Sequence, residues 1–440
     1  MSRYKPYPQY KDSGVEWLGE VPEHWEIVSI KRLCSIKRGA SPRPIDDSKY
    51  FDDDGEYAWV RISDVTASQG YLTQTTQKLS QLGKNLSVPL DPGELFLSIA
   101  GSVGKPIITN IKCCIHDGFV YFKDYRENLK LLFWVFASVQ PCLGLGKMGT
   151  QLNLNVDTVG EIKIGLMPEY EQNAIANFLD NATCKIDTLI QKQQNLIELL
   201  KEKRQALISH AVTKGLNPHV KMKDSGVEWL GEVPEHWEVM KIKHMLEIPI
   251  TDGPHETPEF IDEGVPFVSA EAISSSCIDF NKIRGYISRE ANEIYSKKYS
   301  PKLHDIYMVK SGATTGVTAI VNDRIDFNIW SPLAVFRCSQ KALPNFLLNY
   351  LRSKNFFKAI ELHWSFGTQQ NIGMNVLENL FICLPAIQEQ QEISNYLDNA
   401  TCKIDTLITK AQKAIELLKE RRTALISAAV TGKIDVREIA

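Results

Sequence analysis

The chain has 440 residues, of which 43% are hydrophobic and 23% charged, and its formal net charge is −3. This length exceeds what one ordinary core supports and predicts two or three domains. The near-neutral charge argues against a wholly basic nucleic-acid binder but leaves local basic patches open. No apolar run approaches 18 residues and the start has no apolar signal core, so we expect a cytoplasmic protein without a transmembrane helix. Nine scattered cysteines favour reduced thiols over a disulfide framework or a zinc site.

An exact repeat organises the chain. Residues 11–26 return unchanged as residues 223–238, and residues 179–190 return as residues 397–408. The two offsets, 212 and 218, describe one long duplication with a small length difference inside it. The period is too long for a solenoid, so each copy should hold a domain of its own. The sequence between the repeated blocks does not match closely, which predicts a shared frame around two divergent inserts.

The first 26 residues are expected to form an irregular segment with short helical turns. Trp17 and Trp25 in this segment recur as Trp229 and Trp237. Large aromatic rings supply much buried area per residue. We therefore expect these four rings to anchor the repeated segments onto neighbouring surfaces.

The two inserts, residues 27–167 and 239–384, are predicted to be strand-rich α/β domains, which gives an α+β protein. Runs of aromatic and β-branched residues separated by Gly, Pro, Asp and Asn indicate strands. The clearest runs are residues 57–62, 94–100, 118–122, 265–269 and 305–310. Helices are expected over residues 128–139 and 344–360.

A long helical stripe follows each insert. From residue 169 to about residue 212, apolar residues recur at spacings of three and four without Gly or Pro. Thr183 is a candidate N-cap for a fresh helix running to about Thr213, roughly 45 Å long. The second copy, residues 404–430, presents the same stripe, so we expect an antiparallel pair acting as a stiff spacer. The stripe residues singled out are Ile186, Leu189, Leu196, Leu200, Ile404, Leu407 and Leu418. Residues 431–440 should form a short tail.

Several loops could contact a ligand. Residues 144–149 spell G-x-G-x-x-G, but they follow a helix and lead into no helix, so a flexible loop is the better interpretation. The pattern Gly-Thr-Gln-x-Asn occurs in residues 149–153 and 367–371, where amide side chains suit base edges or phosphates as well as a simple turn. Turns at residues 100–105 and 311–316 follow strands and could hold phosphate oxygens or stand empty.

A basic cluster begins the first insert, although such a run is more often a solvated face. It comprises Lys31, Arg32, Lys37, Arg38 and Arg43. No catalytic or metal-binding set is visible in the sequence. The candidates for DNA contact are Lys37, Arg38, Arg43, Arg61, Ser102, Lys105, Lys147, Thr150, Gln151, Asn153, Thr251, His255, Lys310, Ser311, Thr314, Thr315, Thr368, Gln369 and Asn371.

The chain resembles the specificity subunits of type I restriction-modification systems. The resemblance rests on Asp-Ser-Gly-Val-Glu-Trp-Leu-Gly-Glu-Val-Pro-Glu-His-Trp, on the helix endings at residues 206–213 and 424–431, and on a Pro…Glu-Gln approach to each long helix. That approach comprises Pro168, Glu171 and Gln172 in the first copy and Pro385, Glu389 and Gln390 in the second.

The resemblance implies two target recognition domains, residues 27–167 and 239–384, held apart by two antiparallel helices. Residues 1–26, 168–238 and 385–440 would form the shared frame. Each domain would read one half of a split site on double-stranded DNA, and the divergence of the inserts predicts unlike halves about one helical turn, roughly 34 Å, apart.

Partners implied by the resemblance would carry the chemistry. Two modification subunits would dock on the frame and bring S-adenosylmethionine and adenine methylation, and restriction subunits would bring ATP, Mg and cleavage. This chain itself would hold no cofactor and catalyse nothing. Two other hypotheses are a coiled-coil scaffold that reads no bases and an independent enzyme.

Overall fold

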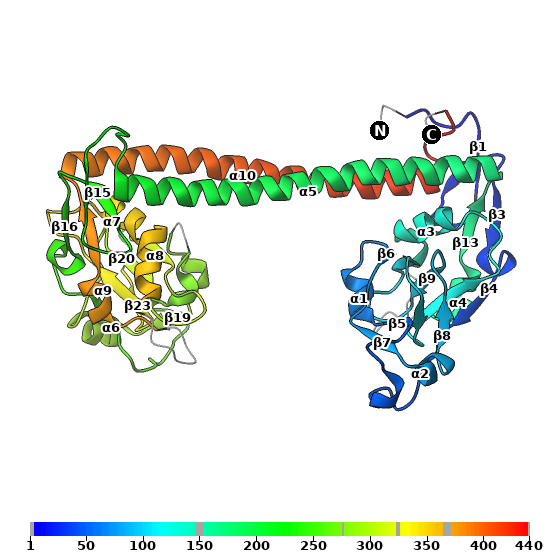
Figure 1. Cartoon of the computed structure of the whole chain (residues 1–440), viewed down its shortest axis with the longest axis horizontal. Coiled ribbons are helices and arrows are strands. Elements are labelled where there is room, and N and C mark those ends of the chain that lie inside the picture. Colours follow the sequence, from blue (N-terminus) through cyan, green and yellow to red (C-terminus); the bar gives the residue numbers. More distant parts are fainter. Residues whose placement is uncertain are drawn as a thin grey trace. The chain divides into compact units, whose positions relative to one another are not determined.

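The computed structural model describes residues 4–143, 145, 154–274, 277–322, 326–363 and 371–438. The chain forms two compact units. Unit 1 contains Met1–Gln193 and Lys413–Ala440, and unit 2 contains Gln194–Gln412. Unit 1 is therefore assembled from two separate stretches of the sequence, whereas unit 2 is continuous (Figure 1). None of the helices in the described ranges combines the length and apolar character needed to cross a membrane.

Two long helices, α5 (Glu169–Lys214) and α10 (Ile387–Val430), pass through both units. The expectation that a fresh helix begins at Thr183 is wrong, because α5 runs unbroken through that residue. The Thr183 hydroxyl donates to the Leu179 carbonyl at 2.7 Å. This bond to the residue one turn earlier satisfies the hydroxyl inside a helix, so the threonine is no stop signal.

The long helices pack against each other in antiparallel directions, as the sequence predicts. In unit 1 the Arg422 guanidinium donates to Asp187 at 2.9 Å. In unit 2, Arg204 lies 3.1 Å from Asp405. The N-terminal half of each helix thus lies beside the C-terminal half of the other (Figure 1). The two ion pairs are duplicates of each other, since the residues are related by the offset of 218.

Unit 1 holds two mixed sheets and two strand pairs. The larger sheet has the order β4-β12-β9-β10-β6 and the smaller the order β7-β5-β11-β8. The sheet strands are β4 (Ser35–Arg38), β5 (Tyr57–Val60), β6 (Tyr71–Leu72), β7 (Gln77–Leu79), β8 (Val88–Leu90), β9 (Leu95–Ser98), β10 (Pro106–Thr109), β11 (Cys113–Ile115) and β12 (Phe119–Lys123). The pairs are β1 (Tyr10–Asp12) with β2 (Glu20–Pro22) and β3 (Glu26–Ser29) with β13 (Lys163–Leu166). The short helices are α1 (Ile62–Ala67), α2 (Gln81–Asn85), α3 (Leu129–Ala137) and α4 (Val156–Glu161).

Unit 2 repeats this plan with fewer strands. Its larger sheet has the order β17-β23-β20-β21 and its smaller the order β19-β18-β22. The sheet strands are β17 (Thr251–Asp252), β18 (Val265–Val268), β19 (Gly285–Ile287), β20 (Ile306–Val309), β21 (Thr318–Ile320), β22 (Asn328–Ile329) and β23 (Leu333–Phe336). The pairs are β14 (Met222–Asp224) with β15 (Glu232–Pro234) and β16 (Glu238–Lys241) with β24 (Phe381–Leu384). The short helices are α6 (Arg289–Ser296), α7 (Pro344–Leu351), α8 (Lys354–Glu361) and α9 (Met374–Asn379).

The single helix expected over residues 344–360 is in fact two helices, α7 and α8. The chain breaks at Ser353, whose hydroxyl accepts from the Phe356 N–H and so begins a new helix. The strand expectations fare better, since each of the five runs contains an observed strand. Mixed sheets joined to long packed helices confirm the α+β class.

Alternate side chains of the central strand face two different cores in each unit. In β9, Leu95 and Leu97 join the core shared with the helices, whereas Phe96 joins the core between the two sheets. In β20, Met308 and Tyr307 divide in the same way. Opposite faces at successive positions follow from strand geometry. Each unit is therefore layered as helices, larger sheet and smaller sheet.

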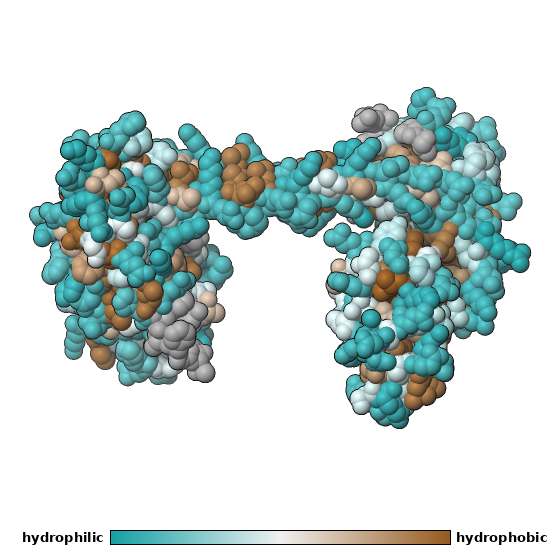
Figure 2. Space-filling view, viewed as in Figure 1, coloured by the Kyte–Doolittle hydropathy of each residue, from teal (hydrophilic) through white to brown (hydrophobic). Residues whose placement is uncertain are grey.

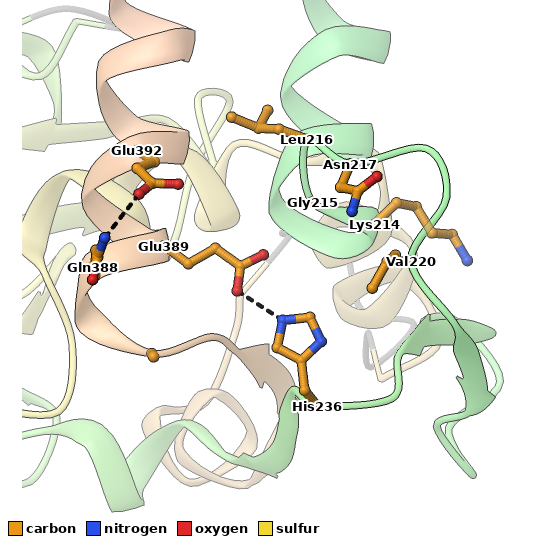
Figure 3. A pocket seen from close by; sticks show the side chains of 10 residues that line it. Lys214, Gly215, Leu216, Asn217, Val220, His236, Gln388, Glu389 and Glu392 are labelled. Atoms are coloured by element: carbon orange, nitrogen blue, oxygen red, sulfur yellow. Dashed lines mark hydrogen bonds and ion pairs between the residues drawn. The ribbon is translucent and has the colours of Figure 1, made fainter.

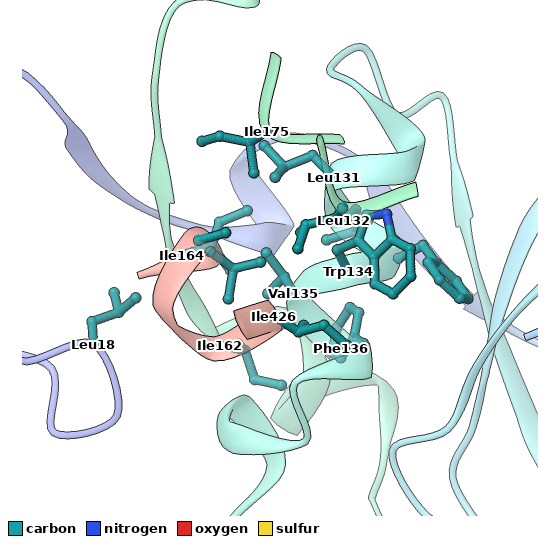
Figure 4. Close-up of a cluster of buried hydrophobic side chains, with 14 of the residues drawn as sticks. Leu18, Leu131, Leu132, Trp134, Val135, Phe136, Ile162, Ile164, Ile175 and Ile426 are labelled. Atoms are coloured by element: carbon teal, nitrogen blue, oxygen red, sulfur yellow. The ribbon is translucent and has the colours of Figure 1, made fainter. Parts of the chain in front are cut away.

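The first core gathers segments that are far apart in the sequence (Figure 4). Ile175 of α5 and Ile426 of α10 pack with Trp134 of α3 and Ile164 of β13. The expected tail also belongs here, because Val436 is fully buried in the same core. The first and last parts of the chain therefore close unit 1 together.

Candidate nucleic-acid interface

A turn follows the central strand in both units and is closed by a glycine N–H. In unit 1 the Gly104 N–H donates to the Ser98 carbonyl at 2.8 Å, and in unit 2 the Gly316 N–H donates to the Val309 carbonyl at 2.8 Å. Both glycines have positive φ, 79° and 91°, which side chains other than glycine rarely adopt. The turns at residues 100–105 and 311–316 thus occupy equivalent places and close on a glycine, although the turn of unit 2 is one residue longer.

The residue that directly follows the Gly-Thr-Gln-x-Asn pattern bonds to the start of this turn in each unit. Leu154 N–H donates to the Ile99 carbonyl at 3.1 Å, and Ile372 N–H donates to the Lys310 carbonyl at 2.9 Å. Asn371 also forms an isolated β-bridge with Ser311. These contacts tie residue 154 of unit 1, and residues 371 and 372 of unit 2, to the turn of their own unit. The candidates Lys147, Thr150, Gln151, Asn153, Thr368 and Gln369 lie outside the described residues.

A third loop in each unit contains a glycine whose backbone lies directly against a backbone carbonyl of a neighbouring segment. A Cβ on Gly39 would lie 2.2 Å from the His116 carbonyl oxygen, and a Cβ on Gly253 would lie 1.9 Å from the Ile329 carbonyl oxygen. Only glycine allows such contact at these positions. The loops after β4 and β17 are therefore pressed against the loops after β11 and β22, which brings the basic candidates to the same edge.

In unit 1 this edge carries exposed arginines around one carboxylate. Arg38 donates to the Asp117 backbone carbonyl, and the Arg43 guanidinium lies 3.3 Å from the Asp117 carboxylate. Ser41 donates to the same carboxylate at 3.0 Å. Burial alone would raise the pKa of Asp117, but the Ser41 hydrogen bond and the charge of Arg38 lower it below its usual value. The carboxylate stays ionised and holds two cations at the surface.

In unit 2 the same edge is built around a buried carboxylate. Asp252 is fully buried, and Lys298 lies 2.5 Å from one of its oxygens. Lys310 and His255 each lie 3.2 Å from the other oxygen. Burial alone would raise the pKa of Asp252, but the ammonium groups of Lys298 and Lys310 lower it. The group fixes two cations and an exposed histidine in one place.

Strand register shows that Arg38 and Asp252 occupy equivalent positions. Arg38 lies opposite Val120 in β12, and Asp252 lies opposite Ala334 in β23. Val120 and Ala334 in turn lie opposite Leu97 and Met308 of the central strands. One backbone frame thus carries opposite charges at the same point in the two units.

A family model described as the type I restriction modification DNA specificity domain matches residues 22–199 and again residues 234–417. The chain belongs to this family. It is a DNA specificity subunit of a type I restriction-modification system, a non-catalytic component. This confirms both the sequence resemblance and the function it implied.

Relatives and solved structures cover nearly the whole specificity subunit. It is 26% identical to the type I restriction enzyme MjaVIII specificity subunit of Methanocaldococcus jannaschii, over 95% of each chain. It is 24% identical to the EcoBI specificity subunit of Escherichia coli, over 96% of this chain and 89% of the relative. A chain from a structural study of complex assembly in the type I R-M system has a TM-score of 0.71 at 17% identity, over 93% and 98% of the two chains. The HsdS subunit of Thermoanaerobacter tengcongensis gives a TM-score of 0.52 at 16% identity, over 94% and 98%.

The remaining candidates for DNA contact fall into two groups: those that lie at this edge and those that are less available there. Arg61 is exposed near His116. Burial lowers the pKa of His116, Asp117 opposes this effect, and the charges of Arg38 and Arg61 contribute to the lowering. Ser102 lies in the shared turn, 2.8 Å from the Thr66 hydroxyl. Thr251, Thr314 and Thr315 lie at the corresponding edge of unit 2.

Two basic residues that were predicted to contact DNA, Lys37 and Lys105, are less available at this edge. Lys37 neighbours Arg38 in β4 and so faces the opposite side of the strand. Lys105 donates to the carbonyls of Thr66 and Ser68 at 3.0 and 2.8 Å, and burial lowers its pKa. The Lys105 ammonium therefore holds the end of α1 rather than standing free.

Sequence reasoning missed the groups that hold the basic residues in place. Asp117 and Asp252 were not singled out, nor was Lys298, which reaches Asp252 from 46 positions away. Nothing local in the sequence marks these residues. The close-contact glycines Gly39 and Gly253 were the available signal, because each directly precedes a loop and follows a charged residue.

The tryptophans of the frame pack into the cores, whereas the apolar residues of the long helices are partly buried and partly exposed. Trp25 and Trp237 are buried in their own units, and Trp17 and Trp229 are partly buried against the same cores. On the long helices, Ile186, Leu200 and Ile404 are buried and Leu418 is partly buried. Leu189, Leu196 and Leu407 remain exposed, and Leu199 and Leu417 join them. Figure 2 shows such apolar patches on the outer surface of the helix pair.

Proposed function

We propose that the specificity subunit reads a split, asymmetric DNA site, with residues 27–167 recognising one half and residues 239–384 the other. The observation that supports this is the replacement of Arg38 by Asp252 within one shared loop frame. Base contacts specify sequence through the donors and acceptors presented to the grooves. Two domains whose loops have the same backbone arrangement but different charges would recognise different bases.

The proposed roles follow from side-chain chemistry. Arg38 and Arg43 are exposed and suit bidentate contact with guanine in the major groove. Lys298, whose side chain is about half exposed, suits phosphate contact, and the mostly buried Lys310 adds positive charge beside it, both held by Asp252. Ser311 and Asn371 would add polar contacts beside them. The arginines would thus contribute specificity, and the lysines would position the duplex.

The shared frame would recruit the catalytic subunits. We assign residues 1–26, 168–238 and 385–440 to this frame, with α5 and α10 setting the spacing of the half-sites. Exposed Leu189, Leu199, Leu407 and Leu417 would provide two similar apolar docking surfaces for two modification subunits. S-adenosylmethionine would bind those subunits, and ATP and Mg would act on restriction subunits. The assembly would work in the cytoplasm.

An insert exchange tests the division of labour. Residues 27–167 are replaced by the matching insert of a relative, and the complex is expressed with its modification subunits. We expect single-molecule sequencing to show methylation at a motif changed in one half only. The reciprocal exchange of residues 239–384 should change the other half. A change in both halves, or in neither, would contradict the proposal.

A salt series separates DNA reading from the scaffold alternative. Affinity for a duplex containing the site should fall steeply with salt in the complex, because phosphate contacts release counterions. Lys298→Gln should reduce the steepness of this salt dependence by roughly one counterion, because it removes one ammonium group from the phosphates. A slope that is shallow and unaffected by the variant would favour a scaffold.

A further inference from the structure

A pocket in unit 2 lies where α5 ends and α10 begins. It has a volume of about 390 Å³ and is lined by Gly215, Val220, His236 and Glu389 among others. Figure 3 shows the His236 ring and the Glu389 carboxylate in direct contact at this pocket, and the hydrogen bond between them is 2.9 Å long. The pocket lies at the start of α10, far in the sequence from the loops assigned to DNA.

The duplicate of this place in unit 1 is filled by the chain itself. Glu171, equivalent to Glu389, is fully buried and accepts three hydrogen bonds. The donors are His24 at 2.8 Å, the Trp25 indole at 2.9 Å and the Tyr7 hydroxyl at 2.7 Å. Tyr7 is only 3% exposed, and burial raises the pKa of its phenol, so the hydroxyl keeps its proton and donates.

The C-terminal tail completes this arrangement in unit 1. The Arg437 guanidinium lies over the Tyr7 ring, 4.9 Å from its centre, and is paired with Asp435. Asp435 N–H in turn donates to the Lys5 carbonyl at 2.8 Å. A tyrosine ring enclosed between a carboxylate and a guanidinium is therefore the occupant that this geometry accepts.

Unit 2 repeats the glutamate, the histidine and the tryptophan of this arrangement, whereas no tyrosine or arginine is among the residues that line its pocket. Glu389 accepts from His236, while the Trp237 indole N–H, which is buried, has no hydrogen-bond partner within the described part of the chain. The residue that aligns with Tyr7 is His219, and it is exposed. Gly215 leaves the space open, since a Cβ there would already lie 3.3 Å from Glu389 Oε1. Among the described residues, two hydrogen bonds that Glu171 accepts in unit 1, from a tyrosine and from a tryptophan indole, thus have no counterpart at Glu389.

We propose that this pocket binds a tyrosine side chain carried by a partner protein, with the phenol hydroxyl donating to Glu389. The ring takes the place that Tyr7 takes in unit 1. The carboxylate rejects anions, and a ring with a donor at its tip matches the walls better than an aliphatic chain. The site does not depend on DNA reading, and it gives the subunit one filled and one open version of the same surface.

A short peptide tests this on the full-length chain. The probe is acetylated and amidated Pro6-Tyr7-Pro8-Gln9, and the readout is the indole N–H resonance of each tryptophan in protein labelled with ¹⁵N-tryptophan. Trp237→Phe assigns the relevant signal. We expect the peptide to shift the Trp237 resonance and leave Trp25 unchanged. The same peptide with Tyr7→Phe should bind about tenfold more weakly, because it lacks the hydrogen bond to the carboxylate.

Two variants of the chain control for binding elsewhere. His219→Tyr gives unit 2 its own ring, so the peptide should no longer shift the Trp237 resonance. His244→Tyr changes another exposed histidine of unit 2 outside the pocket and should bind the peptide normally. Equal binding of the tyrosine and phenylalanine peptides would overturn the proposal. So would tighter binding of the peptide with Tyr7→Lys, or binding unaffected by His219→Tyr.

Discussion

Units 1 and 2 each contain the same sixteen residues, at positions 11–26 and 223–238, yet use them differently. His24 and Trp25 converge on a buried glutamate in unit 1, whereas in unit 2 His236 lines an open pocket with Glu389, and the buried Trp237 makes no hydrogen bond to that glutamate. The identical segments are not responsible, since the difference comes from Tyr7, which lies outside the repeat. A repeated sequence therefore fixes the position of the side chains, and their neighbours outside the repeat decide their hydrogen bonding.

The largest expected difference between the units concerns a buried ion pair. Asp305 and Arg337 are nearly buried and 2.7 Å apart in unit 2, whereas strand register places exposed Glu94 and Lys123 at the corresponding positions of unit 1. Arg337→Ala leaves a buried carboxylate without its partner and should destabilise unit 2 by about 3–5 kcal/mol. Lys123→Ala, the matched control, should cost less than about 0.5 kcal/mol. Hydrogen exchange with mass spectrometry measures the protection of each unit separately. An equal loss of protection in Arg337→Ala and Lys123→Ala would contradict the prediction.

The paired glutamates give the next largest contrast. Glu171→Ala removes the acceptor for three donors and should destabilise unit 1 by about 3 kcal/mol. Glu389→Ala removes the acceptor for one half-exposed histidine and should cost less than about 1 kcal/mol. The denaturant dependence of exchange in each unit measures both. Similar costs would mean that the pocket of unit 2 is closed in solution.

The paired tryptophans isolate one hydrogen bond. Trp25→Phe and Trp237→Phe remove similar ring area, but only Trp25 loses a hydrogen bond to a carboxylate. Trp25→Phe should therefore be the more destabilising by about 1.5–3 kcal/mol, the usual contribution of a hydrogen bond to a charged group. The contribution of the hydrogen bond is the difference between the two losses of stability, each measured from the denaturant dependence of exchange in its own unit. Equal losses would contradict the prediction.

The smallest effect is a pH dependence confined to unit 1. Burial lowers the pKa of His116, whereas Trp330 holds the matching place in unit 2 and does not titrate. A folded pKa below the unfolded value of about 6.5 means that the unfolded state binds the proton more readily. Unit 1 should lose stability as pH falls below about 6.5, and His116→Gln should remove that slope. Exchange in β11 and β22 between pH 7.5 and 5.5 would show whether only β11 responds.

Much of the architecture could be predicted from sequence because it depends on periodicity and exact repetition. The long stripes gave the antiparallel helices, and alternating runs such as residues 94–100 gave the central strands. Local signals were less informative where two structures compete. Thr183 can cap a helix or bond inside it, and Ser353 divides a stretch that is helical on both sides.

The edge that we assign to DNA was only partly predictable. Basic residues such as Arg38 and Lys310 stand out by charge, but the carboxylates that position them are reached across the fold. The equivalence of Arg38 and Asp252 is hidden as well. The offset between the units is 214 residues there, 212 at Gly104 and Gly316 and 218 at Leu154 and Ile372, so only strand register aligns them.

The divided composition of unit 1 has a consequence for synthesis on the ribosome. Unit 2 is one continuous stretch, so every part of it has been translated once Gln412 emerges. Unit 1 begins earlier but needs Ile426 and Val436 for its core. Domains generally fold as units when their sequence is available. The half of the protein that is encoded first should therefore be the last to reach its native state, and a ribosome that stalls just after Gln412 has emerged would display a finished second half beside an incomplete first one.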